Sequence, residues 1–254
     1  MLLAIDIGNT QTSYGVFKGP SLLHHWRGET KAVRSVDEYA SFLFPLLQNV
    51  GISLKDFEGV AICSVVPSCN FNLKTFCEIY LGKNPFFVSH SNKSLFSMGV
   101  ETPAEVGADR LANTAYAVEH LSLPAIVVDL GTATTFDVIT ADRVYQGGII
   151  LPGINMGTEG LSRKTSLLPL VDTDFPKLVI GKNTVTCIQS GILFGYCDAI
   201  DGLLKRIQDE LVSKCEIVLT GGISPLIHRH LKASTKILPN LTLEGIEILY
   251  RANS

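Results

Sequence analysis

The sequence predicts an α/β protein built from two related halves, each with the element order β-β-β-α-β-α-β-α. This prediction depends on a β-hairpin at residues 2–17 and its repeat at residues 127–139. Each hairpin has the same order of residues: an apolar run, an aspartate, one apolar residue, a glycine, several small polar residues and a second apolar run. The two aspartates, Asp6 and Asp129, stand 123 positions apart, so the repeat indicates a duplication rather than a solenoid.

The first half continues with apolar runs that alternate with amphipathic segments. Ser35 is expected to cap the first helix. The expected ranges are a strand at 22–29, a helix at 36–50, a strand at 59–66, a helix at 70–81, a strand at 85–89 and a helix at 104–120. Gly107 falls in the first turn of the last helix, where glycine is unfavourable, and this suggests close approach by another group.

The second half begins near Pro124, so we expect domains at residues 1–122 and 123–254. A Gly-rich stretch and a surface loop at 162–176 follow its first three strands, and Thr184 is expected to cap a long helix. The expected ranges are strands at 125–129, 134–140, 144–151, 216–220 and 235–238, and helices at 184–213, at 225–231 and from 242 onward. Strands that alternate with helices in this way pair in parallel.

The first hairpin carries side chains suited to phosphate and to a metal ion. Asp6 ends a buried strand, where a carboxylate suits a hydrated divalent cation. Gly8 lets a ligand approach the backbone, and the residues after it offer amide and hydroxyl groups to phosphate oxygens: Asn9, Thr10, Thr12 and Ser13. For this segment alone an ordinary tight hairpin is an equal alternative, and the duplication favours phosphate binding. Ligands bind at the carboxyl ends of strands, where Asp6, Asp129 and Gly221 lie, so we expect a nucleotide cleft between the halves.

The bulk composition argues against several classes of function. A net charge of −3 and scattered basic residues give no electrostatic footprint for nucleic acid. The apolar N-terminus lacks the basic flank of a signal peptide, and no apolar stretch is long enough to span a membrane. The six cysteines form no Cys-x-x-Cys pair, which favours free thiols in a reducing cytoplasm over a zinc site.

Seven motifs carry a resemblance to a known family. They are DIGNT at 6–10, SVVP at 64–67, EVGADR at 105–110, DLGTATT at 129–135, GGIILPG at 147–153, GKNT at 181–184 and TGG at 220–222. Two halves with these loops resemble the superfamily of acetate and sugar kinases, heat-shock chaperone ATPases and actin, whose duplicated domains are ribonuclease H-like. Within it the chain most closely resembles the type III pantothenate kinases.

The resemblance implies that a homodimer uses ATP to convert pantothenate to 4'-phosphopantothenate, the first step of coenzyme A biosynthesis. It implies ATP contacts from both Asp-x-Gly loops, at Asp6, Ile7, Gly8, Asn9, Thr10, Gln11, Thr12, Ser13 and Thr132. Asp6 would lie on the magnesium side, and Asp129 would bind a monovalent cation, potassium or ammonium. Pantothenate would contact Gly107, Ala108, Asp109 and Arg110, with Asp109 as the base, and Thr184 would reach it from a neighbouring subunit.

Asp109 stands at the start of a predicted helix, whose positive end should keep its carboxylate ionised. The alternative is that Asp109 and Arg110 are an adjacent surface pair.

The chain departs from the family where a tyrosine and an asparagine are usual, since Val100 and Thr102 occupy those positions. A valine cannot replace a tyrosine hydroxyl as a hydrogen-bond partner, so we expect weaker acceptor binding and intact phosphate machinery.

Three other classes stay open as alternatives: a nucleotide-binding regulator without kinase activity, a phosphatase and a chaperone-like ATPase. Asp109 favours the kinase over the regulator, and the chain has no room for a peptide-binding domain.

The helix expected at 184–213 carries more apolar residues than one buried face needs. With the resemblance, this favours a homodimer, although packing of the helix inside its own domain explains the same residues.

Overall fold

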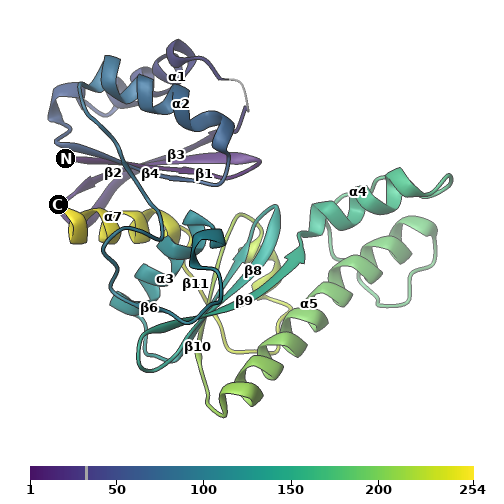
Figure 1. Ribbon diagram of the computed structural model, residues 1–254. Coiled ribbons are helices and arrows are strands. Elements are labelled where there is room, and N and C mark those ends of the chain that lie inside the picture. The colour runs from purple at the N-terminus through teal and green to yellow at the C-terminus, as the bar shows by residue number, and fades with distance from the viewer. Residues whose placement is uncertain (32–33) are drawn as a thin grey trace. The chain divides into compact units, whose positions relative to one another are not determined.

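The structure is a computed structural model that describes residues 1–31 and 34–254 (Figure 1). These residues form two compact units. The first unit comprises Met1–His120, Arg143–Tyr145 and Asn240–Ser254, and the second comprises Leu121–Asp142 and Gln146–Pro239. They differ from the expected halves because the last helix, α7 (Leu241–Asn253), packs on helix α3 (Ala108–His120) of the first unit.

The sheet of the first unit has the strand order β3-β2-β1-β4-β5. Its strands are β1 (Leu2–Ile7), β2 (Gln11–Lys18), β3 (Ser21–Glu29), β4 (Gly59–Ser64) and β5 (Phe86–Phe87). The three meander strands are antiparallel, whereas β1, β4 and β5 run parallel. Helices α1 (Val36–Asn49) and α2 (Pro67–Phe76) lie on one face of this sheet and α7 lies on the other (Figure 1).

The second sheet repeats the first. Its order is β11-β10-β7-β8-β9-β6, in which β9, β8, β7, β10 and β11 take the places of β3, β2, β1, β4 and β5. Its strands are β7 (Ala125–Leu130), β8 (Ala133–Ile139), β9 (Val144–Pro152), β10 (Glu216–Thr220) and β11 (Lys236–Ile237), and its helices are α4 (Ile154–Lys164), α5 (Thr184–Leu211) and α6 (Ser224–His228). The short strand β6 (Ser97–Met98) adds to the first two residues of β9. The predicted α/β class and duplicated element order are therefore confirmed.

Each sheet is buried because its central strands are apolar at successive positions. In β1, Leu3, Ile5 and Ile7 join the core beneath α1 and α2, and Leu2 and Ala4 on the opposite side are buried as well. In β7, Ile126, Val128 and Leu130 pack with Leu193, Ile200 and Leu204 of α5. A strand that is covered on both faces has a continuous apolar sequence. For this reason β1 and β7 were among the most predictable elements.

Two helix starts in the first unit differ from expectation. Helix α2 begins at Pro67, not near residue 70, because proline at the first helical position costs no hydrogen bond. Helix α3 begins at Ala108, and a 3₁₀ turn at Pro103–Glu105 precedes it. The expectation that Gly107 lies within the first helical turn was therefore wrong, since Gly107 stands just before the helix.

Two features of the second unit also differ. Residues expected to form a Gly-rich stretch and the start of a loop form the helix α4, whose glycines hid its helical pattern. Asn183, not Thr184, caps α5, since its side chain accepts the Thr186 N–H at 2.9 Å and the Thr186 side chain closes the capping box. Among the described residues, no helix is both long and apolar enough to cross a membrane.

Helix α7 approaches the backbone of α3 closely at Gly245. A Cβ atom at Gly245 would lie 2.0 Å from the Ala112 carbonyl oxygen. One turn earlier, the Thr242 hydroxyl donates to the buried Asn113 amide oxygen at 2.8 Å. The two helices therefore pack with no side chain between them at this point.

We expect Gly245→Ala to lower the free energy of unfolding by about 1–3 kcal/mol, because the new methyl group meets backbone that cannot rotate away. Gly202→Ala is the control, since Gly202 is exposed within α5 with nothing within 4 Å of its Cβ position. That control should raise the free energy of unfolding by about 0.5–1 kcal/mol through helix propensity. Urea unfolding measures both, and equal stability changes in the two variants would contradict the close packing of α7 on α3.

Candidate active site

The first Asp-x-Gly loop joins β1 to β2 at the carboxyl end of β1. Asp6 pairs with Ser13 of β2 and with Cys63 of β4. The Gly8 N–H donates to the Gln11 carbonyl at 3.0 Å and closes the turn. Residues 9–11 are exposed, so their amide and hydroxyl groups can reach a ligand. Thr12 differs from them, because it is buried and its hydroxyl is hydrogen-bonded to the Thr30 hydroxyl at 2.8 Å.

The second Asp-x-Gly loop, between β7 and β8, repeats this geometry with one residue fewer. Asp129 pairs with Thr135 of β8 and with Thr220 of β10. Leu130 pairs with Thr134, whereas Ile7 in the first hairpin pairs with Thr12. The turn is correspondingly shorter, with the Gly131 N–H donating to the Ala133 carbonyl at 3.2 Å. The difference in residue number between corresponding positions of the two hairpins is therefore constant up to the glycine and is one residue smaller after it.

Two glycines bring other segments against the second loop. The Gly153 N–H donates to the Thr132 carbonyl at 3.1 Å, and a Cβ atom at Gly153 would lie 2.3 Å from that oxygen. Gly221, with φ of +89°, would place a Cβ atom 2.4 Å from the Leu130 carbonyl oxygen. The start of α4 and the Thr-Gly-Gly turn thus touch the loop backbone, and the free N–H groups of α4 begin beside Thr132.

Gly153 belongs to the GGIILPG motif, and the sequence alone predicts no contact for it. Gly153 caps α4, and because the glycines of α4 hide its helical pattern, no sequence signal marks this contact. A helix start beside a phosphate loop is a favourable place for an anion, because N–H groups and the helix dipole act together.

The segment expected to bind the acceptor lies at the same edge of the first sheet as the first loop. Val65 follows β4, and its N–H donates to the Ile7 carbonyl at 3.1 Å. A Cβ atom at Gly107 would lie 3.6 Å from Cγ1 of Val65 and 2.5 Å from Oδ1 of Asp109. The absence of a side chain at Gly107 therefore leaves room for the Asp109 carboxylate beside the strand ends.

Asp109 is half-buried, and this burial acts against the ionised form of its carboxyl group. Burial raises the pKa of its carboxyl group, and the Arg110 N–H, donating to Oδ1 at 2.8 Å, and the Arg110 charge oppose this rise. Desolvation outweighs these contacts, so the pKa of Asp109 lies above the ordinary aspartate value. The expectation that the helix start keeps the carboxylate ionised stays a prediction. The Arg110 guanidinium lies 5.7 Å above the centre of the Tyr145 ring, so it is held by a cation–π contact rather than standing as a surface charge.

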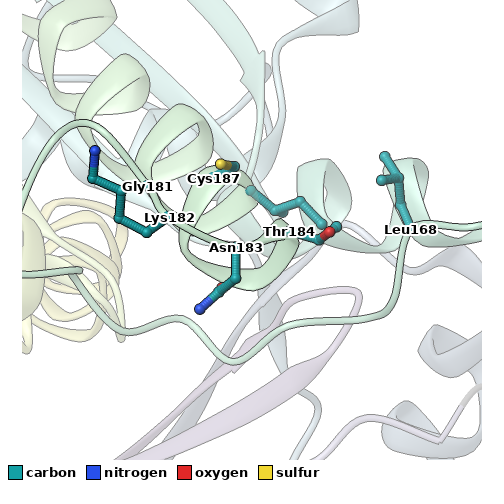
Figure 2. Close-up of a pocket in the computed structure, with 7 residues that line it drawn as sticks. Leu168, Gly181, Lys182, Asn183, Thr184 and Cys187 are labelled. Atoms are coloured by element: carbon teal, nitrogen blue, oxygen red, sulfur yellow. The ribbon is translucent and has the colours of Figure 1, made fainter.

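Thr184 stands apart from the second loop within its own unit. It is exposed and lines an open groove of about 680 Å³ at the start of α5 (Figure 2). The lining residues are Leu168, Gly181, Lys182, Asn183, Thr184, Cys187 and Ile188, none of which belongs to an Asp-x-Gly loop. The structure of this unit therefore does not bring Thr184 together with Asp129 and Thr132.

No group of three or more His, Cys, Asp or Glu side chains within residues 1–31 and 34–254 could hold a metal ion. Asp6 and Asp129 are single carboxylates at strand ends. Such a carboxylate suits a cation that keeps most of its water and takes its other ligands from phosphate.

Comparison with known proteins agrees with this architecture. A Campylobacter jejuni structure titled a putative Baf family transcriptional activator has a TM-score of 0.62 at 19% identity, over 99% of this chain and 98% of that one. The activator of 2-hydroxyisocaproyl-CoA dehydratase from Clostridium difficile has a TM-score of 0.60 at 12% identity, over 99% and 94%. These likenesses show that the chain shares its α/β fold with those proteins over nearly its whole length.

Sequence relatives identify the family within this class. The model of the type III pantothenate kinase family matches residues 2–206. Type III pantothenate kinases from Anaeromyxobacter dehalogenans and Halalkalibacterium halodurans are 44% and 39% identical to the chain, each over the whole of both chains. The chain belongs to the type III pantothenate kinase family, and the predicted activity, ATP-dependent phosphorylation of pantothenate at the start of coenzyme A biosynthesis, is confirmed.

Proposed function

We propose that the chain transfers the terminal phosphoryl group of ATP to the primary hydroxyl of pantothenate, with Asp109 as the base. The observation that supports this assignment is that Gly107 lies near Val65, whose N–H donates to the Ile7 carbonyl, so the segment that leads to Asp109 lies near the strand edge where the first loop begins. A non-catalytic nucleotide-binding regulator would have no need of a carboxylate enclosed in this way. We therefore favour catalysis over a regulatory role.

The phosphoryl donor would be held by the two loops. Residues 6–13 and Thr132 would contact the ATP phosphates, with magnesium on the side of Asp6. Phosphoryl transfer has a loose transition state, so positioning and neutralisation of charge supply most of the catalysis. The exposed groups at residues 9–11 support phosphate binding, and the start of α4 beside Thr132 would add N–H donors.

Asp109 would accept the hydroxyl proton of pantothenate as the new phosphate ester forms. Its raised pKa makes it a stronger base than an exposed aspartate, and its hydrogen bond from Arg110 holds one oxygen in place. Gly107, Ala108 and Arg110 would contact the rest of the acceptor. Val100 lies in the same segment and would not supply the hydrogen bond that a tyrosine hydroxyl could make with the acceptor.

We expect Asp109→Asn to lower kcat by roughly two to four orders of magnitude, the range of general-base catalysis. Asparagine keeps the shape and can still accept the Arg110 N–H, so ATP affinity should not change. In the unsubstituted enzyme, kcat/KM should fall as pH drops through the Asp109 pKa, at a higher pH than an ordinary aspartate would give, because only the ionised form accepts a proton.

A coupled assay of ADP release and calorimetric ATP titration measure these effects. Glu210→Gln, which removes an exposed carboxylate on α5, is the control and should match the unsubstituted enzyme. Near-normal turnover of the Asp109→Asn variant would remove this residue from the role of base.

We also propose that Asp129 helps to bind a monovalent cation, potassium or ammonium. Thr135 and Thr220 are its neighbours on the two flanking strands, so all three side chains lie on one face of the sheet. A carboxylate with two neighbouring hydroxyls offers the oxygen ligands that hard cations require.

Activity with magnesium should accordingly rise severalfold when potassium or ammonium replaces sodium at constant ionic strength. Asp129→Asn should abolish most of this response, and Asp142→Asn, which changes an exposed carboxylate in the turn after β8, should keep it. Equal initial rates in sodium and potassium buffers for the unsubstituted protein would refute the cation site.

We further propose a homodimer in the cytoplasm, assembled around the start of α5. The segment before α5 exposes large apolar side chains at Leu167, Leu170, Leu178, Val179 and Ile180. Leu167 is 90% exposed and Ile180 is 73% exposed, beside the groove that Thr184 lines. A segment with this many exposed apolar side chains is typical of an interface, and covering it by a second copy would bring Thr184 to the partner.

Ile180→Asp should convert the dimer to a monomer, since an aspartate buried in an apolar interface would lose its water without a counter-ion. Phe71→Asp is the matched control, because Phe71 is 77% exposed on α2 of the other unit and should leave the assembly unchanged. Light scattering at micromolar concentration measures the mass. An unsubstituted protein that is monomeric and fully active would contradict the proposal.

A further inference from the structure

The segment between β5 and α3 has little secondary structure of its own. Over residues 88–107 the only regular elements are the two-residue strand β6 and one 3₁₀ turn. Its end carries Gly107 and leads directly into Asp109. The position of the acceptor site therefore depends on what holds this segment from outside.

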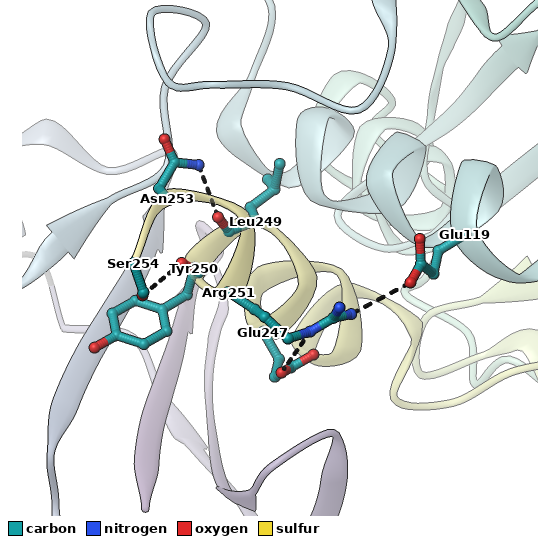
Figure 3. A network of polar contacts seen from close by, with 7 residues as sticks. All are labelled: Glu119, Glu247, Leu249, Tyr250, Arg251, Asn253 and Ser254. Atoms are coloured by element: carbon teal, nitrogen blue, oxygen red, sulfur yellow. Dashed lines mark hydrogen bonds and ion pairs between the residues drawn. The ribbon is translucent and has the colours of Figure 1, made fainter.

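Helix α7 supplies one such contact through Asn253, 160 residues away in sequence. Oδ1 of Asn253 accepts the Lys93 N–H at 2.9 Å, and Nδ2 donates to the Lys93 carbonyl at 2.9 Å. Nδ2 also donates to the Leu249 carbonyl, one turn back on the same helix, at 2.8 Å (Figure 3). Both backbone groups of Lys93 are thus paired with one side chain, which is itself fixed to its own helix.

The segment is packed against α7 and α3 just beyond this contact. Phe96 and Met98 meet Leu111 of α3 and Leu249 of α7 around a cavity of only about 20 Å³. Phe96 is buried, so the chain cannot shift here without opening a void.

From there the segment reaches the acceptor residues through the first residues of β9. The Ser97 N–H donates to the Arg143 carbonyl at 3.0 Å, and the Gly99 N–H donates to the Tyr145 carbonyl at 2.8 Å. The Tyr145 ring in turn lies under the Arg110 guanidinium. A continuous path of contacts therefore joins Asn253 to the residue beside Asp109.

We propose that Asn253 is a positioning residue for the acceptor site: it fixes the backbone of Lys93 and so sets the path of the segment that ends at Gly107. The proposal rests on the proposed contact of pantothenate with residues 107–110. Because Asn253 acts through Lys93 and touches no reacting atom, its loss should weaken acceptor binding and leave ATP binding as it is.

The test uses Asn253→Leu, which keeps the approximate size of the side chain and removes all three hydrogen bonds. We expect KM for pantothenate to rise about threefold to tenfold, with KM for ATP and kcat within about twofold. Hydrogen exchange should speed up in peptides covering residues 89–100 and stay unchanged in β1 and β4. Asn253→Asp keeps the acceptor for the Lys93 N–H, but its second carboxylate oxygen faces the Lys93 and Leu249 carbonyl oxygens in place of the donors, so KM for pantothenate should rise here too. This variant is used if the leucine variant does not fold.

Two controls separate positioning from general stability. Ser254→Ala removes a hydrogen bond of 2.8 Å to the Tyr250 carbonyl on the same helix, and Lys93→Ala removes an exposed side chain while keeping the backbone that Asn253 binds. Both should keep the unsubstituted KM for pantothenate. An unchanged exchange rate at residues 89–100 would overturn the proposal, as would an unchanged KM for pantothenate or equal rises in both KM values. If the unsubstituted protein did not phosphorylate pantothenate, the proposed function would fail, and hydrogen exchange would still decide whether Asn253 holds the segment.

Discussion

Both candidate phosphate loops depend on parallel pairing between two buried strands. β1 pairs with β4 so that Asp6 stands beside Cys63, and β7 pairs with β10 so that Asp129 stands beside Thr220. Parallel strands end at a common edge, and in each pair the aspartate lies level with the last or next-to-last residue of the neighbouring strand. The carboxylates therefore stay at the strand ends, where an aspartate can meet solvent and ligand.

Contacts that only glycine permits then complete each site. Gly153 and Gly221 bring a helix start and a turn onto the second loop at distances that leave no space for a Cβ atom. In the first unit, the absence of a side chain at Gly107 leaves room for the Asp109 carboxylate in its observed position. Much of the site is thus backbone in contact with backbone, and its geometry follows from missing side chains as much as from those present.

Sequence reasoning could reach the fold because it depends on patterns that repeat. The apolar runs before Asp6 and Asp129, and the alternation that follows, predicted the order and most strand positions. It missed α4, since a helix with two internal glycines carries a weak local signal and is stabilised by packing on α5, where Gly157 faces Ile192. It also assigned α7 to the second half, because nothing local records that Gly245 fits against Ala112.

The sequence marks the candidate site residues by motif, and their contacts and electrostatics depend on the folded chain. The motif that contains Gly107, Asp109 and Arg110 marks these positions without geometry, and the contacts of Gly107 with Val65 and Asp109 needed coordinates. The contacts of Asn253 could not be inferred, since an amide that binds backbone 160 residues away leaves no pattern in the chain.

The pKa of Asp109 shows how two local rules can oppose each other. A helix start favours the ionised carboxylate, whereas burial favours the neutral acid, and which wins depends on how much water the folded chain excludes. Here burial outweighs the Arg110 contacts, so the carboxylate gains proton affinity. A base that must accept a proton late in phosphoryl transfer benefits from that gain, and the Arg110 N–H limits it. If Asp109 is the base, the enclosure that strengthens it would also move the acid limb of the pH profile to higher pH.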